Sequence, residues 1–365
     1  MAHQRNQSVG TDPDAGVDLA VRAWERHCLS LGRPVGRSPG AVTRLKRQRR
    51  EWHKSAVYRL EGVGDDGSAV VGKRCMRGSG RVERDVYEKL LPRIKLPRLR
   101  HYGYLEEDDT GFVWLFIGDA GNAKPTMADR EVIAEWLARL QAESAPLSGD
   151  VPLPDRGPDY YFGLLPAAQK GLAAAVAAAV RSGHDARVLD VIATALDRLE
   201  CYRGLVSDIC ARWPRTLVHA DFSRKHVRLR RPDAGLPAYV LALDWETAGW
   251  GPPAADLADV PWGRSRDDIE ADSPDMPDHA TPWFGPVSLD AYASAIATTW
   301  PGVSRVDVDR LSRVGAVFRI IQATCWATCQ VELGGIDKGM GALGAYAPDL
   351  VSAITTLDGW QTAAP

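Results

Sequence analysis

Four side chains that could handle protons or metal ions lie close together in the middle of the chain. His219, Asp221 and His226 belong to the stretch Leu217–Val227, LVHADFSRKHV, and Asp244 ends the next apolar run, LALD. The sequence VRLR and the run LALD flank a turn rich in Pro and Gly, which predicts a β-hairpin. Such a hairpin would bring the carboxylates of Asp221 and Asp244 together.

Two carboxylates in this arrangement suit phosphoryl transfer. One could accept a proton from the substrate while the other holds a cation, and the reaction depends mainly on positioning the nucleophile and neutralising phosphate charge through a divalent metal. A structural alternative is that His219 and Asp221 cap a turn and that Asp244 only ends a strand. A second alternative is a metal-dependent hydrolase, because imidazole and carboxylate together suit zinc or manganese.

Three motifs, in this order and spacing, resemble a known family. HADFSRKH, LDWE and GPPAADLA are similar to the H-x-D-x-x-x-x-N, D-W-E and D-L-A signature of the aminoglycoside phosphotransferase family. The resemblance implies a protein-kinase-like, two-lobed α+β fold, with a small antiparallel β-sheet in the N-terminal lobe and a larger helical C-terminal lobe. It also implies ATP or GTP as phosphoryl donor, Mg²⁺ as metal ion and a hydroxyl of a small molecule as acceptor.

The family pattern assigns roles to the central residues. Asp221 stands at the catalytic position, where a carboxylate orients the acceptor hydroxyl and takes its proton late. Asp244 stands at the Mg²⁺ position, which suits a hard oxygen ligand. His226 replaces the usual Asn as the second metal ligand, and an imidazole there would favour Mn²⁺. His219 is interpreted as structural, and Asp256 as a brace of the catalytic loop or a helix N-cap.

The segment before residue 118 is rich in short strand patterns. Hydrophobic alternation and turn residues predict a series of antiparallel strands, with one amphipathic helix before them and another between the third and fourth strands. The expected elements are a helix at 17–31, strands at 42–47, 56–60 and 69–75, a helix at 81–91, and strands at 96–105 and 111–117.

Lys73 lies in the third of these strands and is the nucleotide lysine that the resemblance implies. A helix glutamate holds this lysine in the family. The spacing in ERDVYEKL favours Glu83 for that role, and Glu88 is the alternative. Ser55, directly before the second strand, is assigned to the same nucleotide site.

A competing pattern covers the same lysine. Residues 67–73, GSAVVGK, match the Walker A spacing, but that loop requires Ser or Thr after the lysine, and Arg74 stands there. The residues between the two glycines are also strand formers rather than loop formers. We therefore interpret the match as a coincidence.

Helical patterns dominate after residues 118–122, GDAGN, the expected hinge between lobes. A loop is expected at 154–161. The acidic, Pro-rich residues 264–279 are either a solvated loop or a lip that attracts a cationic acceptor. The expected helices are 128–143, 167–180, 186–213, 311–333 and 348–360.

The expected domains are 1–40, a leader and helix; 41–118, the nucleotide lobe; and 119–365, the helical lobe.

Composition limits the class of protein. A chain of 365 residues with 45% apolar content can bury a large core. The net charge of −2 and the scattered arginines argue against nucleic-acid binding. The longest apolar run, 172–180, is too short to span a bilayer and the N-terminus lacks a hydrophobic signal core, so we expect a cytoplasmic protein without a membrane partner. Six cysteines without a CxxC pair predict buried free thiols.

The family resemblance implies an ATP- or GTP-dependent O-phosphotransferase acting on a cationic antibiotic or a related metabolite. Three alternatives remain at this point. The acceptor could be a Ser or Thr of a biosynthetic peptide. The chain could be a non-catalytic nucleotide-binding relative, since His226 departs from the family pattern and a Gly-rich phosphate loop is missing from the sequence. The third alternative is the metal-dependent hydrolase.

Overall fold

The structure is a computed structural model that describes residues 13–32, 38–46, 55–108, 110–231, 238–258 and 287–362. The chain forms two compact units. The first comprises Met1–Glu88 and Arg98–Gly121, and the second comprises Lys89–Pro97 and Asn122–Pro365. The chain passes from the first unit to the second after Gly121, within the segment 118–122. The role of this segment as a hinge stays a prediction.

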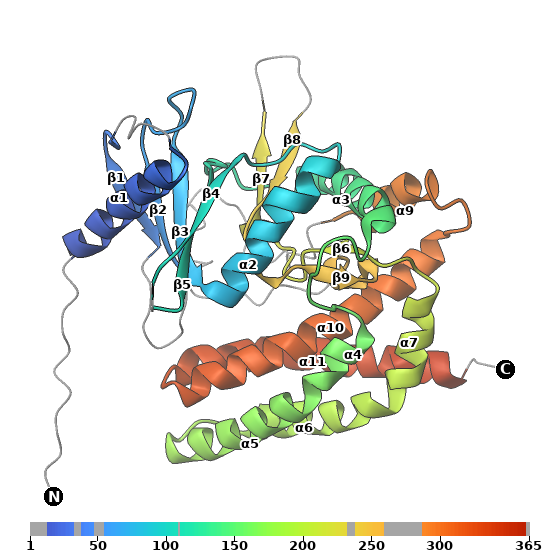
Figure 1. Cartoon of the computed structure of the whole chain (residues 1–365). Coiled ribbons are helices and arrows are strands. Elements are labelled where there is room, and N and C mark those ends of the chain that lie inside the picture. The colour runs from blue at the N-terminus through green and yellow to red at the C-terminus, as the bar shows by residue number, and fades with distance from the viewer. Residues whose placement is uncertain are drawn as a thin grey trace, which may run out of the picture. The chain divides into compact units, whose positions relative to one another are not determined.

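The first unit contains a five-stranded antiparallel sheet in the order β1-β2-β3-β5-β4 (Figure 1). Along β2, buried residues alternate with half-buried ones, as expected for a sheet with one face on a core. Central strand β3 pairs with β5 along its whole length and sets Lys73 opposite Leu115. The strands are β1 (Val42–Lys46), β2 (Ala56–Leu60), β3 (Val70–Met76), β4 (His101–Glu106) and β5 (Phe112–Gly118).

Helix α1 (Pro13–Ser30) packs on this sheet, with Trp24 edge-to-face against Phe116 at 5.1 Å between ring centroids. It belongs to the first unit. Helix α2 (Arg77–Asp85) follows β3 without a loop and continues as a π-helical turn, η2 (Val86–Leu90). The expected helix at 81–91 thus begins four residues earlier in the structure.

Gly80 lets α2 approach the sheet closely. A Cβ atom at this position would lie 2.2 Å from Val113 Cγ2 and 3.0 Å from Cys75 Sγ, so no side chain fits there without a shift. Glu83 lies about one helical turn further along α2. The close approach at Gly80 therefore sets the distance between Glu83 and strand β3.

The second unit is mainly helical (Figure 1). Its helices are α3 (Arg130–Ser144), α4 (Pro158–Gly163), α5 (Leu165–Arg181), α6 (Arg187–Leu199), α7 (Arg203–Ala211), α9 (Leu289–Ala297), α10 (Arg305–Glu332) and α11 (Ile336–Thr362). Its strands are β6 (Thr216–Val218), β7 (Val227–Arg230), β8 (Tyr239–Ala242) and β9 (Gly249–Gly251). Its short helical turns are η3 (Leu91–Arg93), η4 (Met127–Asp129), η5 (Ala145–Leu147), η6 (Glu200–Tyr202), η7 (Arg224–His226), η8 (Trp245–Thr247) and η9 (Pro253–Asp256).

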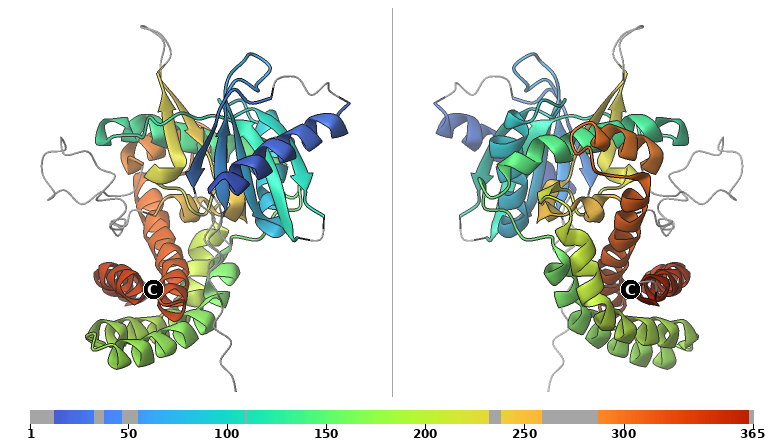
Figure 2. Two further views of the ribbon diagram at one scale, coloured as in Figure 1. Left: turned by 90° about the vertical axis from the view of Figure 1, so that its left-hand side faces the viewer. Right: turned by 90° about the vertical axis from the view of Figure 1, so that its right-hand side faces the viewer.

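Helices α5, α6, α10 and α11 lie side by side in this unit (Figures 1 and 2). Glycines allow two of the contacts: a Cβ at Gly171 would lie 2.4 Å from Thr328 Oγ1, and one at Gly339 would lie 2.4 Å from Val331 Cγ2. Residues 158–181 have the length and composition of a membrane-spanning helix. This is weak evidence, because core helices of globular proteins pass the same test, and α5 is rich in alanine and packs on α10.

Several helix boundaries differ from the sequence-based prediction. The expected helix 186–213 is two helices, because α6 ends at Leu199 and α7 begins at Arg203, next to the weak helix former Gly204. The expected loop at 154–161 contains the start of α4, whose first residue, Pro158, suits that position. Helix α9 was not predicted.

The C-terminal helices are longer than expected. Helix α10 begins at Arg305 rather than at residue 311, because Ser304 and Asp307 form a capping box. Helix α11 contains Pro348 in its interior, where we expected the helix to start. The six cysteines are free as expected, but Cys201 and Cys329 are exposed rather than buried. The acidic segment 264–279 and most of the Pro- and Gly-rich turn between β7 and β8 lie outside the described residues.

The predicted hairpin is confirmed. Strand β7 pairs antiparallel with β8, from Val227 opposite Ala242 to Arg230 opposite Tyr239. Strand β6 pairs separately with β9. His226 therefore directly precedes one strand of the hairpin, and Asp244 follows the other by two residues.

Candidate active site

The first unit contains a buried ion pair. Lys73 Nζ lies 2.7 Å from Glu83 Oε2, and the two side chains are exposed by only 7% and 0%. Glu88 is instead half-exposed and lies 3.7 Å from Arg84. The structure thus selects Glu83 over Glu88 as the partner of Lys73. Ser55 is buried at the start of β2, and its contact with a nucleotide stays a prediction.

Asp221 is held by two cationic side chains in the second unit. Its Oδ1 accepts a hydrogen bond from Nη1 of Arg319 on α10, and its Oδ2 lies 3.3 Å from Lys225 Nζ. Burial alone would raise the pKa of Asp221, but the guanidinium, the ammonium and His226 outweigh burial and hold this pKa well below its usual range. Asp221 is therefore ionised at neutral pH and can accept a hydrogen bond from a hydroxyl.

Arg319 is a residue of this site that the sequence analysis missed. It lies 98 positions after Asp221, so no local motif connects the two. A signal was nevertheless present, because Arg319 interrupts the apolar run VFRII on a helix that is otherwise buried around it. A lone arginine in such a run indicates a partner charge in the core.

The ring of His226 lies between the two carboxylate residues. Its Nδ1 is 2.8 Å from the carbonyl oxygen of Asp221, so this nitrogen donates a hydrogen bond. The other ring nitrogen, Nε2, is then free of hydrogen in the neutral ring and lies 3.3 Å from Asp244 Oδ2. The structure thus brings Asp221, His226 and Asp244 together, as the sequence predicted for the two carboxylates.

The spacing of Nε2 and Oδ2 fits a shared cation. Two neighbouring ligands that each lie about 2.1 Å from an octahedral metal ion are about 3.0 Å apart. The observed 3.3 Å is close to this value. His226 and Asp244 could therefore hold one divalent ion with little movement.

His219 has contacts of a structural residue. Its Nε2 donates to the carbonyl oxygen of Leu243 at 2.9 Å, which ties the catalytic loop to the residue before Asp244. Burial, with a smaller contribution from His226, lowers the pKa of His219 to about 4, so the ring is neutral at physiological pH. The rings of His219 and His226 stack at 5.5 Å between centroids.

Asp256 braces the catalytic loop from beneath. Its Oδ2 accepts from the backbone N–H of His219 and its Oδ1 from that of Ala220, both at 2.8 Å. Burial raises the pKa of Asp256 to about 7, although the two N–H groups act in the opposite direction. The alternative role as an N-cap is wrong, because Asp256 is the last residue of η9 rather than the residue before it.

Backbone strain is concentrated at this site. Within the described ranges, Ala220 and Asp244 are the two non-glycine residues with positive φ, at 62° and 67°. Each such conformation costs on the order of 1–2 kcal/mol and persists only where surrounding contacts impose it. For Ala220 these contacts are the hydrogen bond that its backbone N–H donates to Asp256 Oδ1 and the bond that Thr247 Oγ1 donates to the carbonyl oxygen of His219, both at 2.8 Å. The strain sets the directions of Asp221 and Asp244.

A family model described as the phosphotransferase enzyme family matches residues 49–279, which is more than half of the chain. The chain belongs to this family. The match includes the Lys73–Glu83 pair and the loop from His219 to Asp256, and it confirms the resemblance drawn from the three motifs. No curated protein matches the sequence.

Comparison with solved structures shows the fold of this chain. The chain is similar to aminoglycoside 2'-phosphotransferase-IIIa in a GDP complex, with a TM-score of 0.57, 12% identity and coverage of 93% of this chain and 99% of that one. It is also similar to choline kinase from Cryptosporidium parvum Iowa II, with a TM-score of 0.55, 12% identity and coverage of 88% and 93%. A thermostable mutant of aminoglycoside phosphotransferase APH(4)-Ia gives 0.51, 16% identity and coverage of 89% and 97%. The kinase-like α+β fold is confirmed.

Proposed function

We propose that this phosphotransferase transfers a phosphoryl group from ATP or GTP to a hydroxyl group of a small molecule. The observation that carries the proposal is the convergence of Asp221, His226 and Asp244, with ring-to-carboxylate distances of 3.5 and 3.3 Å. Asp221 accepts the hydrogen bond of the acceptor hydroxyl, orients its oxygen and takes the proton late in the transfer.

His226 Nε2 and Asp244 Oδ2 are the groups that would hold a divalent metal ion. A bound Mg²⁺ or Mn²⁺ would neutralise charge on the transferred phosphoryl group. Mg²⁺ prefers oxygen ligands, whereas Mn²⁺ also accepts imidazole, so the pair of ligands favours Mn²⁺ more than two carboxylates would. The hydrogen bond from Nδ1 to the Asp221 carbonyl oxygen fixes the ring for this role.

Lys73 is the proposed phosphate-binding residue on the nucleotide side. Its ammonium is held by Glu83, which keeps the charged group fixed in a nearly dry environment. Ser55, buried just before β2, is proposed as a further nucleotide contact. Similar solved structures include complexes with GDP and with ADP, which is why both ATP and GTP stay in the proposal.

The acceptor is proposed to carry several hydrogen-bond donors. Beyond Arg319 on α10, the buried Oε1 of Gln322 has no hydrogen-bond partner in the described part of the chain. Two turns beyond Arg319, about 10 Å along the helix, the indole of Trp326 is 50% exposed. An ammonium or hydroxyl group could donate to Gln322, and a cation could lie over the indole.

These features support a cationic acceptor, and so do similar structures solved with kanamycin or hygromycin B. An aminoglycoside-like antibiotic would fit, and an enzyme that modifies it in the cytoplasm would confer resistance. A peptide Ser or Thr is the competing hydroxyl acceptor. The acidic segment 264–279, which would attract a cation, lies outside the described residues.

The test is an acceptor panel assayed with labelled ATP and GTP in the wild-type protein and in Asp221→Asn. We expect the variant to keep its nucleotide affinity and lose turnover by at least about a hundredfold, the usual value of a positioned acid–base group. Asp190→Asn, which changes an exposed carboxylate on α6, is the matched control and should stay active. Turnover in Asp221→Asn above about a hundredth of wild type would remove Asp221 from this role.

Absence of transfer to every acceptor, together with no nucleotide-induced rise in melting temperature, would contradict the proposal itself. If the purified protein then contained tightly bound zinc, the metal-dependent hydrolase would replace it. Nucleotide binding without any transfer or hydrolysis would instead favour the non-catalytic relative.

A further inference from the structure

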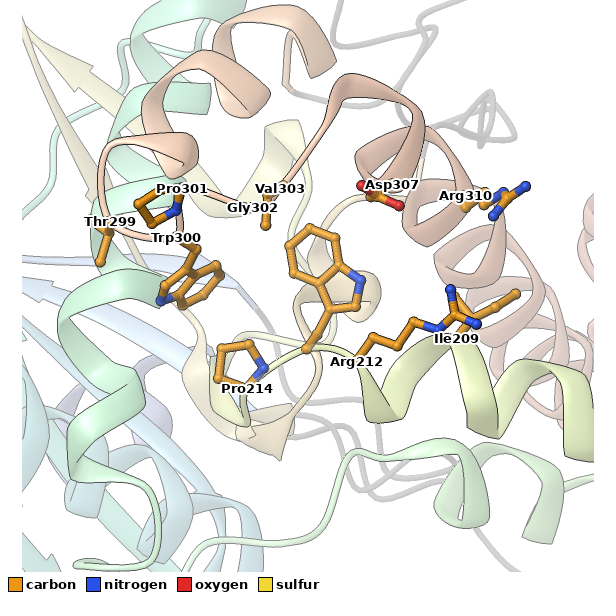
Figure 3. Close-up of a pocket in the computed structure, with 11 residues that line it drawn as sticks. Ile209, Arg212, Pro214, Thr299, Trp300, Pro301, Gly302, Val303, Asp307 and Arg310 are labelled. Atoms are coloured by element: carbon orange, nitrogen blue, oxygen red, sulfur yellow. The ribbon is translucent and has the colours of Figure 1, made fainter.

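A pocket lies in the helical unit, where the end of α7 meets the start of α10 (Figure 3). Its volume of about 540 Å³ is within the range of about 300–1,000 Å³ that is usual for small-molecule sites. Arg310, which lines it, precedes Arg319 by nine residues on α10, or about 13 Å along the helix. The pocket is therefore separate from the residues around Asp221.

Two indole rings form the apolar wall of this pocket. Trp213 and Trp300 meet edge-to-face, with centroids 6.1 Å apart and planes at 77°. Trp213 is 9% exposed and Trp300 is half-buried, so both rings are fixed by packing yet line open space. A flat apolar molecule could stack there with little loss of side-chain freedom.

Two arginines line the opposite side of the pocket, away from Trp300 (Figure 3). Neither Arg212 nor Arg310 makes an ion pair or hydrogen bond with any residue that the structure describes. Nearby arginines differ: Arg215 bonds Asp155 and the carbonyl oxygen of Trp250. Two guanidinium groups that face one cavity without a hydrogen-bonded or ion-paired protein partner indicate an anionic ligand, because guanidinium binds carboxylate and phosphate in bidentate geometry.

Among the described residues that line the pocket, Asp307 is the one carboxylate, and it already accepts hydrogen bonds. Its Oδ2 accepts hydrogen bonds from the backbone N–H of Ser304 at 3.0 Å and from Ser304 Oγ at 2.5 Å, which caps α10. These bonds, with smaller contributions from Arg310 and Arg212, lower the pKa of Asp307. With two guanidinium groups and one capped carboxylate, the pocket keeps a net positive charge.

We propose that this pocket binds a planar aromatic anion, with its ring against Trp213 and Trp300 and its carboxylate, sulfonate or phosphate between Arg212 and Arg310. The site lies outside the phosphotransfer machinery, and neither the family assignment nor the proposed function accounts for it. A neutral ring would lack the charge-assisted hydrogen bonds, and a non-aromatic anion would lack the stacking surface.

The experiment is calorimetric titration of the full-length protein with 2-naphthoate in the presence of saturating nucleotide, which blocks the nucleotide site. We expect one saturable site, and binding of the neutral analogue 2-naphthamide that is at least about tenfold weaker. Arg212→Ala and Arg310→Ala should each weaken 2-naphthoate binding about tenfold or more, since each removes a charged hydrogen-bond donor. Both side chains are exposed, so unchanged melting temperatures should show that the variants fold.

Arg305→Ala is the matched control, because Arg305 begins the same helix but pairs with Asp290 at 2.5 Å. It should bind 2-naphthoate like wild type. The proposal is overturned if no saturable binding occurs, if 2-naphthamide binds equally well, or if the two arginine variants bind like the control. It is also overturned if Lys73→Ala abolishes binding of 2-naphthoate, since the probe would then occupy the nucleotide site. If the chain self-associates and Arg212→Ala abolishes this self-association, the pocket is a protein contact, and the proposal is likewise overturned. None of these outcomes depends on phosphotransfer.

Discussion

Replacement of Asp256 by alanine tests how the catalytic loop is held. Asp256 supplies the acceptor for two buried N–H groups, those of His219 and Ala220. Alanine would leave both donors without a partner in the core. Ala220 would also lose one of the contacts that keep its φ at 62°.

The expected decrease in the free energy of unfolding follows from the loss of these two hydrogen bonds. Each buried donor that loses its acceptor costs about 1–3 kcal/mol, or roughly 2–6 kcal/mol for the pair. Relaxation of Ala220 to an ordinary conformation would recover about 1–2 kcal/mol. We therefore expect Asp256→Ala to lower the free energy of unfolding by about 3 kcal/mol, which is well above the usual effect of about 1 kcal/mol for a point mutation.

Urea denaturation followed by tryptophan fluorescence measures this change. Asp309→Ala is the control, because Asp309 is 40% exposed and pairs with Arg313 at 3.0 Å, which predicts a loss below about 1 kcal/mol. Asp256→Asn keeps one acceptor oxygen and should lie between the two. If Asp256→Ala were no more destabilising than the control, the two backbone bonds would not hold the loop and the reasoning would fail.

The same carboxyl group predicts a pH dependence. Its pKa is about 7 in the folded chain, against 3.8 for an unperturbed aspartate. A raised pKa favours the protonated form in the folded state, so its stabilising contribution is complete below about pH 4 and is lost as the pH rises through 7. The stability of wild type relative to Asp256→Asn should therefore fall between these pH values, by up to about 1.4 kcal/mol per unit. A difference that does not vary with pH would refute the raised pKa.

Three further predictions concern the rest of the site. Lys73→Ala and Glu83→Ala should each lower turnover. The double variant should be little worse than Lys73→Ala, because the two side chains, 2.7 Å apart, act as one unit. Additive losses of activity in a kinetic double-mutant cycle would contradict the pairing. His226→Asn should stay active but lower the ratio of Mn²⁺- to Mg²⁺-supported activity, and an unchanged ratio would exclude a direct metal contact. Gly80→Ala should destabilise the chain by about 1–3 kcal/mol in urea, since its Cβ would meet Val113 at 2.2 Å. Gly78→Ala in the same helix, with open space around it, should be neutral or stabilising.

Elements with a strong local pattern were predicted well. Strand β2 has the predicted bounds, Ala56–Leu60, because its residues alternate between a buried and a half-buried face. The hairpin of β7 and β8 was predicted because two apolar runs flank a turn rich in Pro and Gly. The choice of Glu83 over Glu88 also followed from helix spacing, since Glu88 lies on another face of the helix and reaches solvent.

The wrong predictions have physical causes that a local sequence pattern does not show. Pro348 was expected to begin a helix, but it lies inside α11, where packing against α10 and α6 outweighs the cost of the proline. The break between α6 and α7 depends on a single short turn that does not alter the amphipathic pattern. The pairing of Arg319 with Asp221 joins distant segments, and only the tertiary fold brings them together.

The pairing of Arg319 with Asp221 has a consequence for the order in which the site is completed during synthesis. The loop residues His219 to Asp256 leave the ribosome first, and Arg319 follows Asp221 by 98 residues. At about 5–20 residues per second, translation of that interval takes roughly 5–20 seconds. During this time the nascent chain carries Asp221 without its guanidinium partner, and a chain that stops before α10 never acquires this partner. The loop from His219 to Asp256 is thus synthesised before Arg319, the residue that completes its contacts.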